Sequence, residues 1–124
     1  MGISQDSIHQ EALRILDELE SISFKDCYPL SKDFSELPSC PGIYAVKYRD
    51  SGIVYVGKSG HVRNRFKGGH KVLNWALLDR VPPEDIRIAV VLLSYPWTRL
   101  SLQLERIILQ VRRPSHNDRI AQED

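Results

Sequence analysis

The middle third of the chain concentrates the cationic side chains that could bind a polyanion. Residues 41–80 hold eight Lys and Arg residues against two Asp and Glu residues, an excess of six positive charges. Residues 1–40 hold three against eight, and residues 81–124 hold six of each, so the whole chain carries only +1. A cationic block of this kind is typical either of a nucleic-acid-binding surface or of an ordinary solvated face.

One carboxylate stands beside the apolar stripe of a predicted helix. Glu105 adjoins the residues that form this stripe, which are Leu102, Leu104 and Ile108. A carboxylate at the edge of a buried stripe needs a cation, because an unpaired buried charge costs folding free energy. The pattern therefore predicts either a metal ligand or a structural ion pair with Arg65 or Arg106.

Two tyrosines lie in neighbouring runs of β-branched and aromatic residues. Tyr44 belongs to the run 42–48 (GIYAVKY) and Tyr55 to the run 53–57 (IVYVG), with a turn sequence at 50–52 between them. Two such runs joined by a short turn predict an antiparallel hairpin. On composition alone the tyrosines would be packed strand residues, and the nearby Lys58 and Arg65 would be solvated surface charges.

The order of these residues resembles the GIY-YIG nuclease family. The sequences PGIY at 41–44 and YVGK at 55–58 resemble the two short motifs that name the family, with Tyr-Val-Gly in place of Tyr-Ile-Gly. Arg65 follows Tyr55 by ten residues, Glu105 lies in the last long helix, and PSHN at 114–117 closes with Asn117. The family has an arginine, a glutamate and a closing asparagine in this order, so the resemblance covers about residues 41–118.

The resemblance implies a metal-dependent endonuclease that hydrolyses DNA phosphodiester bonds by a single-metal mechanism. Glu105 would be the direct ligand of Mg²⁺ (or Mn²⁺), with water and a phosphate oxygen completing the coordination. Arg65 would stabilise the negative charge that develops at the phosphate. Tyr44 would be the general base, and because free tyrosine has a pKa of ~10, Lys58 would lower that pKa electrostatically.

Further roles follow from the same resemblance. Tyr55 would orient water or phosphate through its hydroxyl, and Asn117 would position either the active-site backbone or Glu105. Gly42 and Gly57 would allow either a close approach of strands or access of a phosphate where a side chain would intrude. The residues expected to contact nucleic acid are Gly57, Lys58, Arg63, Arg65, Lys67, His70 and Lys71.

The remaining histidines and both tryptophans have simpler interpretations. His9, His61 and His116 are expected to be ordinary surface residues, and Trp75 and Trp97 to be core or lid residues rather than platforms for stacked bases. Whether His70 carries a proton in the reaction is left open. It lies five residues after Arg65, whereas family members that use a histidine have it one helical turn after the arginine.

Two other functions remain alternatives to the nuclease. One is a catalytically weak nucleic-acid-binding or protein-interaction module that retains the fold, and the other is a small structural protein with a coincidental hairpin. DNA is the expected partner and RNA stays open as a substrate. A homodimer and a separate DNA-targeting partner are both compatible with one catalytic site per chain.

Hydrophobic periodicity predicts the elements that must position these residues. A helix is expected over 6–20, capped by Ser4 or Asp6, and a connector interrupted by prolines follows it over 21–41. After the hairpin we expect a short helix within 58–69 with Ser59 as its N-cap and a second helix over 70–80. A third strand over 87–93 and a long helix capped by Thr98 complete the pattern.

The order of elements predicts the fold class and three segments. The class is α+β: a single small domain with a central three-stranded antiparallel sheet flanked by helices, and an additional N-terminal helix. The segments are an acidic amphipathic helix with its connector (1–40), the nuclease-like domain (41–118) and a C-terminal tail (119–124).

Composition excludes several other classes of protein. The longest apolar run, 88–93, is far shorter than the ~18–20 residues of a membrane span, and the N-terminus has no secretory signal pattern. The two cysteines match no zinc-binding spacing and are expected to be reduced, partly buried thiols. We therefore expect a cytoplasmic protein that does not associate with membranes.

Overall fold

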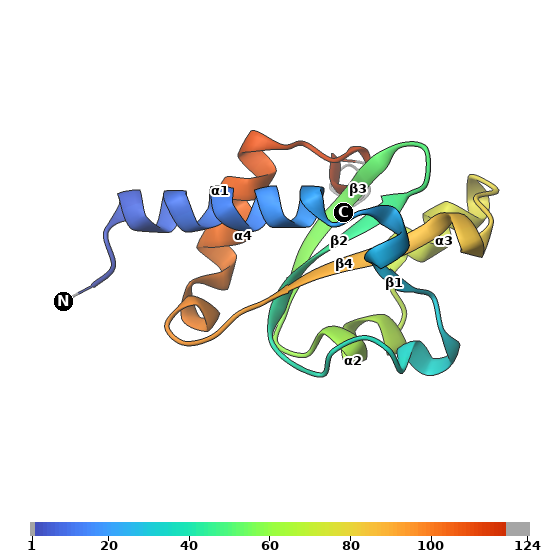
Figure 1. Ribbon diagram of the computed structural model, residues 1–124, viewed down its shortest axis with the longest axis horizontal. Helices are drawn as coiled ribbons and strands as arrows, with labels where there is room; N and C mark the ends of the chain where they lie inside the picture. The colour runs from blue at the N-terminus through green and yellow to red at the C-terminus, as the bar shows by residue number, and fades with distance from the viewer. Residues whose placement is uncertain (1, 119–124) are drawn as a thin grey trace.

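Side chains that alternate along three strands divide the core into two halves, one on each face of the sheet. The computed structural model describes residues 2–118, so the expected tail lies outside the described residues. The helices and strands are α1 (Gln5–Ser21), β1 (Tyr28–Pro29), β2 (Gly42–Tyr48), β3 (Gly52–Ser59), α2 (Val62–Lys67), α3 (Lys71–Leu78), β4 (Ile86–Leu92) and α4 (Ser101–Val111) (Figure 1), and residues 115–118 are also helical. Four short 3₁₀ turns connect them: Phe24–Asp26, Lys32–Phe34, Pro83–Asp85 and Trp97–Leu100.

The sheet is fully antiparallel and has the strand order β1-β4-β2-β3. Strand β2 is central and pairs with both β3 and β4, so the predicted hairpin and the predicted third strand are confirmed. Tyr44 pairs with Gly57 and Val46 with Tyr55, which places both tyrosines on one face of the sheet. The pairing register shifts after Val46, so the alternation is regular through the stretch that carries the tyrosines.

The α+β class is confirmed, but the sheet has four strands where the sequence predicted three. The additional strand, β1, is two residues long and pairs Tyr28 with Ile88 at the outer edge of β4. Two residues are too few to show a period-2 pattern, and Pro29 argues against a strand when it is met in sequence. Strand β1 therefore depends on its pairing with β4 and could not be predicted locally.

Two pairs of helices cover the two faces of the sheet. Helix α1 lies across α4 (Figure 1), and both bury their apolar residues against the face of β2 that presents Ile43 and Ala45. Helices α2 and α3 cover the other face, where they pack around Tyr44 and Val46. The tyrosine motif therefore faces the two short helices, whereas the predicted metal ligand comes from a helix on the opposite side.

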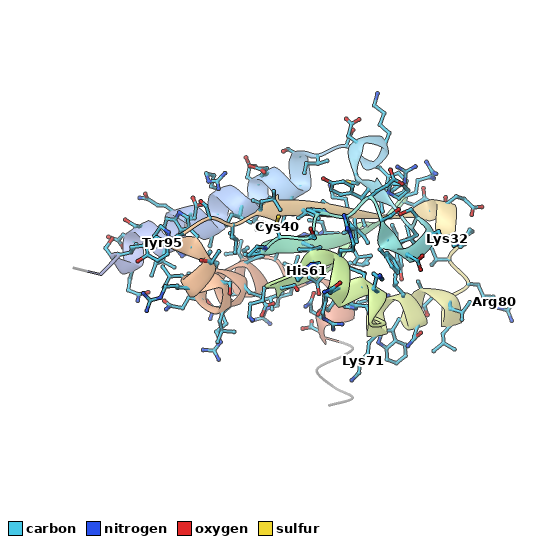
Figure 2. All side chains as sticks on the ribbon, turned by 90° about the horizontal axis from the view of Figure 1, so that it is seen from below. Lys32, Cys40, His61, Lys71, Arg80 and Tyr95 are labelled. Atoms are coloured by element: carbon cyan, nitrogen blue, oxygen red, sulfur yellow. The ribbon has the colours of Figure 1, made fainter. Side chains whose placement is uncertain are left out.

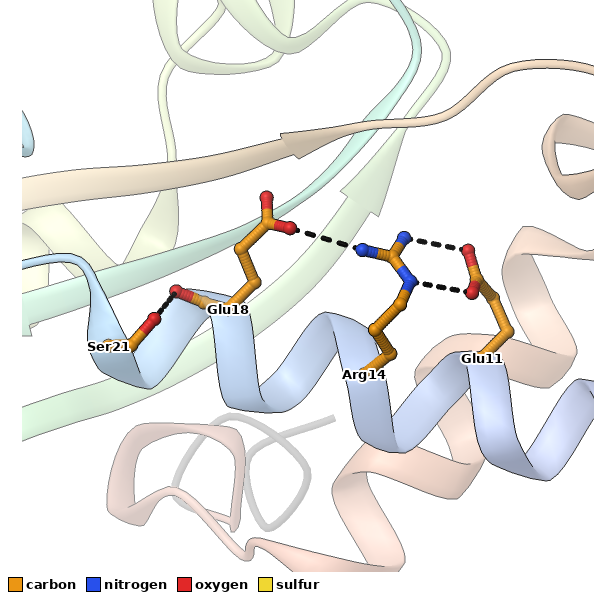
Figure 3. Close-up of polar contacts among 4 residues, drawn as sticks. All are labelled: Glu11, Arg14, Glu18 and Ser21. Atoms are coloured by element: carbon orange, nitrogen blue, oxygen red, sulfur yellow. Dashed lines mark hydrogen bonds and ion pairs between the residues drawn. The ribbon is translucent and has the colours of Figure 1, made fainter.

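Helix α1 follows the predicted amphipathic pattern. Ser4 caps it, since its Oγ accepts a hydrogen bond from the Ser7 backbone N–H at 3.1 Å. On the outer surface Arg14 bridges Glu11 and Glu18 at 2.7 and 3.1 Å (Figure 3). Exposed ion pairs of this kind contribute at most about 1 kcal/mol. The helix is held mainly by its buried stripe of Ile8, Ala12, Ile15, Leu16 and Leu19.

The two short helices begin later than the sequence predicted. Strand β3 continues to Ser59, because its pairing with β2 extends to Gly42, so Ser59 is not the helix cap. His61 caps α2 instead, accepting from the Asn64 N–H at 3.2 Å. In the same way the His70 ring accepts from the Val72 N–H at 3.1 Å and caps α3.

Helix α4 also starts differently from the prediction. Thr98 lies inside the 3₁₀ turn Trp97–Leu100, and α4 begins at Ser101 without a side-chain cap. Of the two thiols, Cys27 is buried and Cys40 is exposed, and neither forms a disulfide. Within residues 2–118 no helix is both long and apolar enough to cross a membrane.

Candidate active site

The pairing of Tyr44 with Gly57 brings the two motif tyrosines together. A β-carbon built on Gly57 would lie 2.6 Å from Tyr44 Oη, 2.7 Å from Tyr44 Cζ and 2.9 Å from Tyr55 Cε1. The Tyr44 ring therefore lies across the glycine toward Tyr55, and the two ring centroids are 6.1 Å apart. Only glycine leaves room for this arrangement. The space that Gly57 leaves is thus taken by the Tyr44 ring, a contact that the sequence did not predict.

An aromatic cluster holds the two tyrosines from the side of the short helices. Phe66 of α2 packs edge-on against Tyr44 with centroids 4.9 Å apart. The His70 ring stacks on Phe66 at 5.1 Å and contacts Tyr55 edge-on at 4.8 Å. Tyr44, Phe66 and His70 are almost completely buried, whereas Tyr55 is half-buried. Tyr55 is therefore the hydroxyl of this cluster that lies nearest to solvent.

The hydrogen bonds of His70 fix which ring nitrogen carries the proton. Nδ1 accepts from the Val72 backbone N–H, so the neutral ring must carry its hydrogen on Nε2. Nε2 lies 2.8 Å from Tyr44 Oη and donates to it. The Tyr55 ring lies beside Tyr44 with the ring centroids 6.1 Å apart, and the electrostatic interaction between the two hydroxyls raises the pKa of Tyr44. The tautomer of His70 thus sets the direction of its hydrogen bond to Tyr44, from the ring nitrogen to the hydroxyl oxygen.

Burial sets the protonation states of Tyr44, Tyr55 and His70. Desolvation raises the pKa of Tyr44 far above its ordinary value, the Tyr55 hydroxyl adds to the rise, and the charge of Arg65 opposes it. Desolvation and the charge of Glu105 raise the pKa of Tyr55, again against Arg65. Desolvation, with a smaller contribution from Arg65, lowers the pKa of His70 to about 4. At neutral pH both tyrosines are protonated and His70 is uncharged.

Glu105 is a half-buried carboxylate near the same tyrosines. Desolvation raises its pKa, and the charge of Lys58, the backbone N–H of Lys58 and the charge of Arg106 oppose that rise. It forms no ion pair within 4.0 Å with any of the residues 2–118. A desolvated carboxylate of this kind favours a cation, so Glu105 fits a ligand for a divalent metal. The same part of the chain contains no cluster of three metal-binding side chains, so a metal here would take its other ligands from water and substrate.

Lys58 acts on a different group from the one expected. The sequence assigned to Lys58 the lowering of the Tyr44 pKa, but the cation that lowers this pKa is Arg65. Lys58 pairs with Ile43, which belongs to the face covered by α1 and α4, and its charge acts on Glu105. The side-chain alternation of β3 explains the difference, because neighbouring residues of a strand point to opposite faces.

The residues expected to contact nucleic acid do not all lie at the surface. Arg65, Lys67 and Lys71 are exposed, and Figure 2 shows Lys71 projecting from α3. Lys58 is half-buried, as is Arg63, which donates through Nε to the Leu37 carbonyl at 2.9 Å. Gly57 and His70 are buried in the aromatic cluster. The exposed cations of this set therefore come from α2 and the start of α3.

Asn117 holds the backbone of β3 between the two motif residues. Its Oδ1 accepts from the Val56 N–H and its Nδ2 donates to the Val56 carbonyl, both at 2.8 Å. Because β3 is an edge strand, the asparagine amide satisfies a donor and an acceptor that no neighbouring strand covers. Of the two contacts expected for Asn117, the structure contains the one with the backbone.

The sequence did not predict the burial and contacts of two histidines. His116 was expected at the surface, but it is 7% exposed, and its Nε2 lies 2.9 Å from Tyr48 Oη and 3.5 Å from Asp79 Oδ2. His61 is half-buried and caps α2. A cap can be suspected from a histidine just before a helix, but no local signal links His116 to Tyr48, 68 residues earlier.

Comparisons with known proteins give a short likeness. No protein-family model matches the chain. A 36-residue stretch is 44% identical to part of UvrABC system protein C from Prosthecochloris aestuarii, and this stretch covers 29% of the chain. It spans only 6% of that protein's length. The likeness agrees with the motif resemblance but is too short to establish membership of a family.

Proposed function

We propose that this protein is a metal-dependent nuclease that hydrolyses DNA phosphodiester bonds at the site formed by Tyr44, Tyr55, Arg65 and Glu105. The observation that carries the proposal is the convergence of these groups. A desolvated carboxylate and an exposed guanidinium act on the same pair of tyrosine hydroxyls, although they come from opposite faces of the sheet. The short likeness to UvrABC system protein C also supports a nuclease function.

Glu105 is the residue that would hold Mg²⁺ or Mn²⁺. A divalent ion there would neutralise phosphate charge and lower the pKa of the attacking water. Arg65 is exposed and anchored by a hydrogen bond from Nη1 to the Gly69 carbonyl at 3.0 Å. Its planar guanidinium would bind non-bridging phosphate oxygens and stabilise the charge that develops during attack.

The tyrosines would manage the proton of the attacking water. Tyr44 would act as the general base only after it has lost its own proton, and the neighbouring, more exposed Tyr55 hydroxyl would pass that proton toward solvent. Arg65 is the cation that favours the resulting phenolate. Tyr55, the more exposed of the two, would orient water or phosphate. Asn117 would keep the strand between Tyr55 and Gly57 in place.

One observation favours a second candidate, a nucleic-acid-binding module with little catalysis. Tyr44 is 1% exposed and its pKa lies far above neutrality, so the base is fully protonated in the free protein. In both cases DNA is the proposed partner. One site cuts one strand, so cleavage of a duplex would need a second copy or a separate partner.

The deciding experiment is cleavage of supercoiled plasmid and of a branched oligonucleotide in Mg²⁺, Mn²⁺ and EDTA. We expect metal-dependent nicking by the wild type, none by Glu105→Gln, and full activity in the control Glu36→Gln, which changes an exposed carboxylate. Glu105→Gln should bind DNA at least as well as the wild type, because a negative charge leaves the phosphate site.

Mg²⁺ should also raise the melting temperature of the wild type but not of Glu105→Gln, because a ligand that binds only the folded state stabilises it. Salt-sensitive DNA binding without cleavage would favour the module. The absence of both binding and cleavage would contradict both candidates.

A further inference from the structure

Helix α3 exposes more apolar surface than a water-facing helix needs. Val72 and Ala76 are its buried residues, yet Leu77 and Leu78 are 77% and 68% exposed. Leu77 has the highest exposed fraction of the large apolar side chains in residues 2–118. Exposed apolar side chains grouped on one short helix mark an interaction surface.

The same helix carries a shallow hollow of about 300 Å³ lined by Lys71, Asn74, Trp75 and Leu78. These four positions are spaced i, i+3, i+4 and i+7, so they form one continuous face of α3. The hollow combines a half-buried indole, an apolar wall, a side-chain amide and an ammonium group. An aromatic face stacks on a planar ring, an amide can pair with the polar edge of that ring, and an ammonium group suits a phosphate.

The hollow lies close to the candidate active site. His70 caps α3 and bonds to Tyr44, so the helix begins at the tyrosine cluster. Lys71 and Leu78 are separated by seven residues, which is about 10 Å along the helix axis. Successive nucleotides of a duplex strand rise by about 3.4 Å. A strand at the tyrosine site could therefore reach the hollow within a few nucleotides.

The charges around the hollow favour a polyanion over an apolar protein surface. Lys67 at the end of α2 and Arg80 just after α3 are exposed, and Figure 2 shows Lys71 and Arg80 projecting from the two ends of this helix. The one carboxylate of this stretch, Asp79, lies 3.5 Å from His116. Cations therefore border the exposed leucines on both sides.

We infer that the hollow on α3 binds an unstacked nucleobase of the substrate strand, with Trp75 as the stacking surface. This inference rests on the proposed function and narrows its substrate to nucleic acid with an unpaired nucleotide near the scissile bond. Leu77, which does not line the hollow and is 77% exposed, occupies the gap that the displaced base leaves, as apolar side chains do at unstacked base steps. Trp75, expected from sequence to be a core or lid residue, is assigned to binding.

The test compares oligonucleotide duplexes that are matched or carry one unpaired nucleotide, bound in EDTA to prevent cleavage. We expect Trp75→Leu, which keeps an apolar side chain but removes the aromatic face, to weaken binding of the bulged duplex about 5- to 150-fold. Trp75→Phe should lose less affinity for the bulged duplex, because it keeps an aromatic ring. Neither variant should change the affinity for the matched duplex. The ratio of the affinities for the bulged and matched duplexes therefore distinguishes loss of the base pocket from loss of folding.

Fluorescence gives a second, independent measurement. The chain has two tryptophans, so Trp97→Phe leaves Trp75 as the only one, and Trp75→Phe is the matched control. The bulged duplex should quench Trp75 and leave Trp97 unchanged. Equal quenching by both duplexes, or equal affinities in Trp75→Leu, would overturn the inference.

The outcomes separate this inference from the proposed function. Metal-dependent cleavage without any preference for the bulged duplex overturns the base pocket alone. A bulge preference that depends on Trp75, without cleavage in any metal, overturns the nuclease alone. A dimer in solution that Leu77→Asp dissociates, with no change in the affinity ratio, would assign the helix to a second copy of the chain and also overturns the pocket.

Discussion

The β-carbon position of Gly57 lies 2.6 Å from the hydroxyl oxygen of Tyr44, its pairing partner across β2 and β3. Phe66 also packs against the Tyr44 ring, which is 1% exposed, so the ring cannot turn outward to make space. The glycine therefore fixes where the Tyr44 hydroxyl lies relative to Tyr55.

Gly57→Ala should displace the Tyr44 ring and damage both folding and cleavage. Overpacking a closed core costs about 1–3 kcal/mol, and a catalytic group misplaced by about 1 Å can cost about 100-fold in rate. Urea unfolding and the plasmid nicking rate measure the two effects. Gly60→Ala is the control, because a β-carbon at Gly60 meets no heavy atom within 4 Å. Wild-type nicking by Gly57→Ala would show that the position of Tyr44 does not matter.

His70 should make stability depend on pH below neutrality. Its pKa is about 4 in the folded protein against an ordinary value of 6.5, so between these values only the unfolded chain binds the proton. Stability should be constant above pH 6.5 and fall as the pH drops toward 4, by at most about 3 kcal/mol. Urea titrations at several pH values measure the slope.

A matched pair of variants isolates this histidine from other titrating groups. His70→Asn keeps an N-cap acceptor but does not titrate, so its stability should fall less steeply than that of the wild type. His9→Asn changes an exposed histidine on α1 and should keep the wild-type slope. If the free energy of unfolding fell equally steeply with pH in the wild type and in His70→Asn, the low pKa of His70 would be contradicted.

Asn117 should stabilise the fold through its two hydrogen bonds to the backbone of Val56. Asn117→Ala leaves a buried N–H and a carbonyl without their partners, at a cost of about 1–3 kcal/mol. Asn117→Asp keeps the acceptor for the N–H but loses the donor to the carbonyl. Hydrogen exchange at the Val56 amide should therefore be fast in Asn117→Ala and slow in the wild type and Asn117→Asp. Asn64→Ala, at an exposed position, should leave it unchanged.

Arg65 should affect cleavage far more than stability. Arg65→Ala should lower the nicking rate by about 10²- to 10³-fold, the usual loss for one donor to a developing oxyanion. Arg65→Lys keeps the charge but not the planar pair of donors, so its nicking rate should lie between those of the wild type and Arg65→Ala. Arg65 is exposed with one hydrogen bond to Gly69, so the melting temperature should move little.

Two further measurements check this role of Arg65. NMR titration should find a higher His70 pKa in Arg65→Ala, because the charge of Arg65 lowers it in the wild type. Arg99→Ala, at another exposed arginine, serves as the control for both rate and titration. A large fall in melting temperature in Arg65→Ala would instead make the residue structural.

The fold was predictable where a periodic pattern is long enough to overrule local alternatives. Helix α1 and strands β2, β3 and β4 follow their apolar patterns closely. Strand β1 and the start of α2 are decided by pairing with distant strands, so Tyr28 and Ser59 carry no local sign of their conformation.

The site was predictable as a set of residues but not as a set of contacts. The motif order brings out Tyr44, Tyr55, Arg65 and Glu105, because their spacing is visible in the chain. The bond between Tyr44 and His70 joins residues 26 positions apart and has no sequence pattern. The charge of Lys58 acts on Glu105 because of the face of β3 from which its side chain leaves, and the register of the sheet decides that face.

The packing of α1 on α4 makes the minimal folding fragment longer than the stretch that bears the motifs. Five buried residues of α1 share one apolar cluster with Leu104 and Ile108 of α4, the two residues that flank Glu105 on its inner side. Truncating the chain to begin at residue 41 would expose both to water and loosen the helix that carries the carboxylate. The acidic N-terminal helix thus stabilises the helix that carries Glu105, the proposed metal ligand, and a fragment designed to test the proposed activity would have to include it.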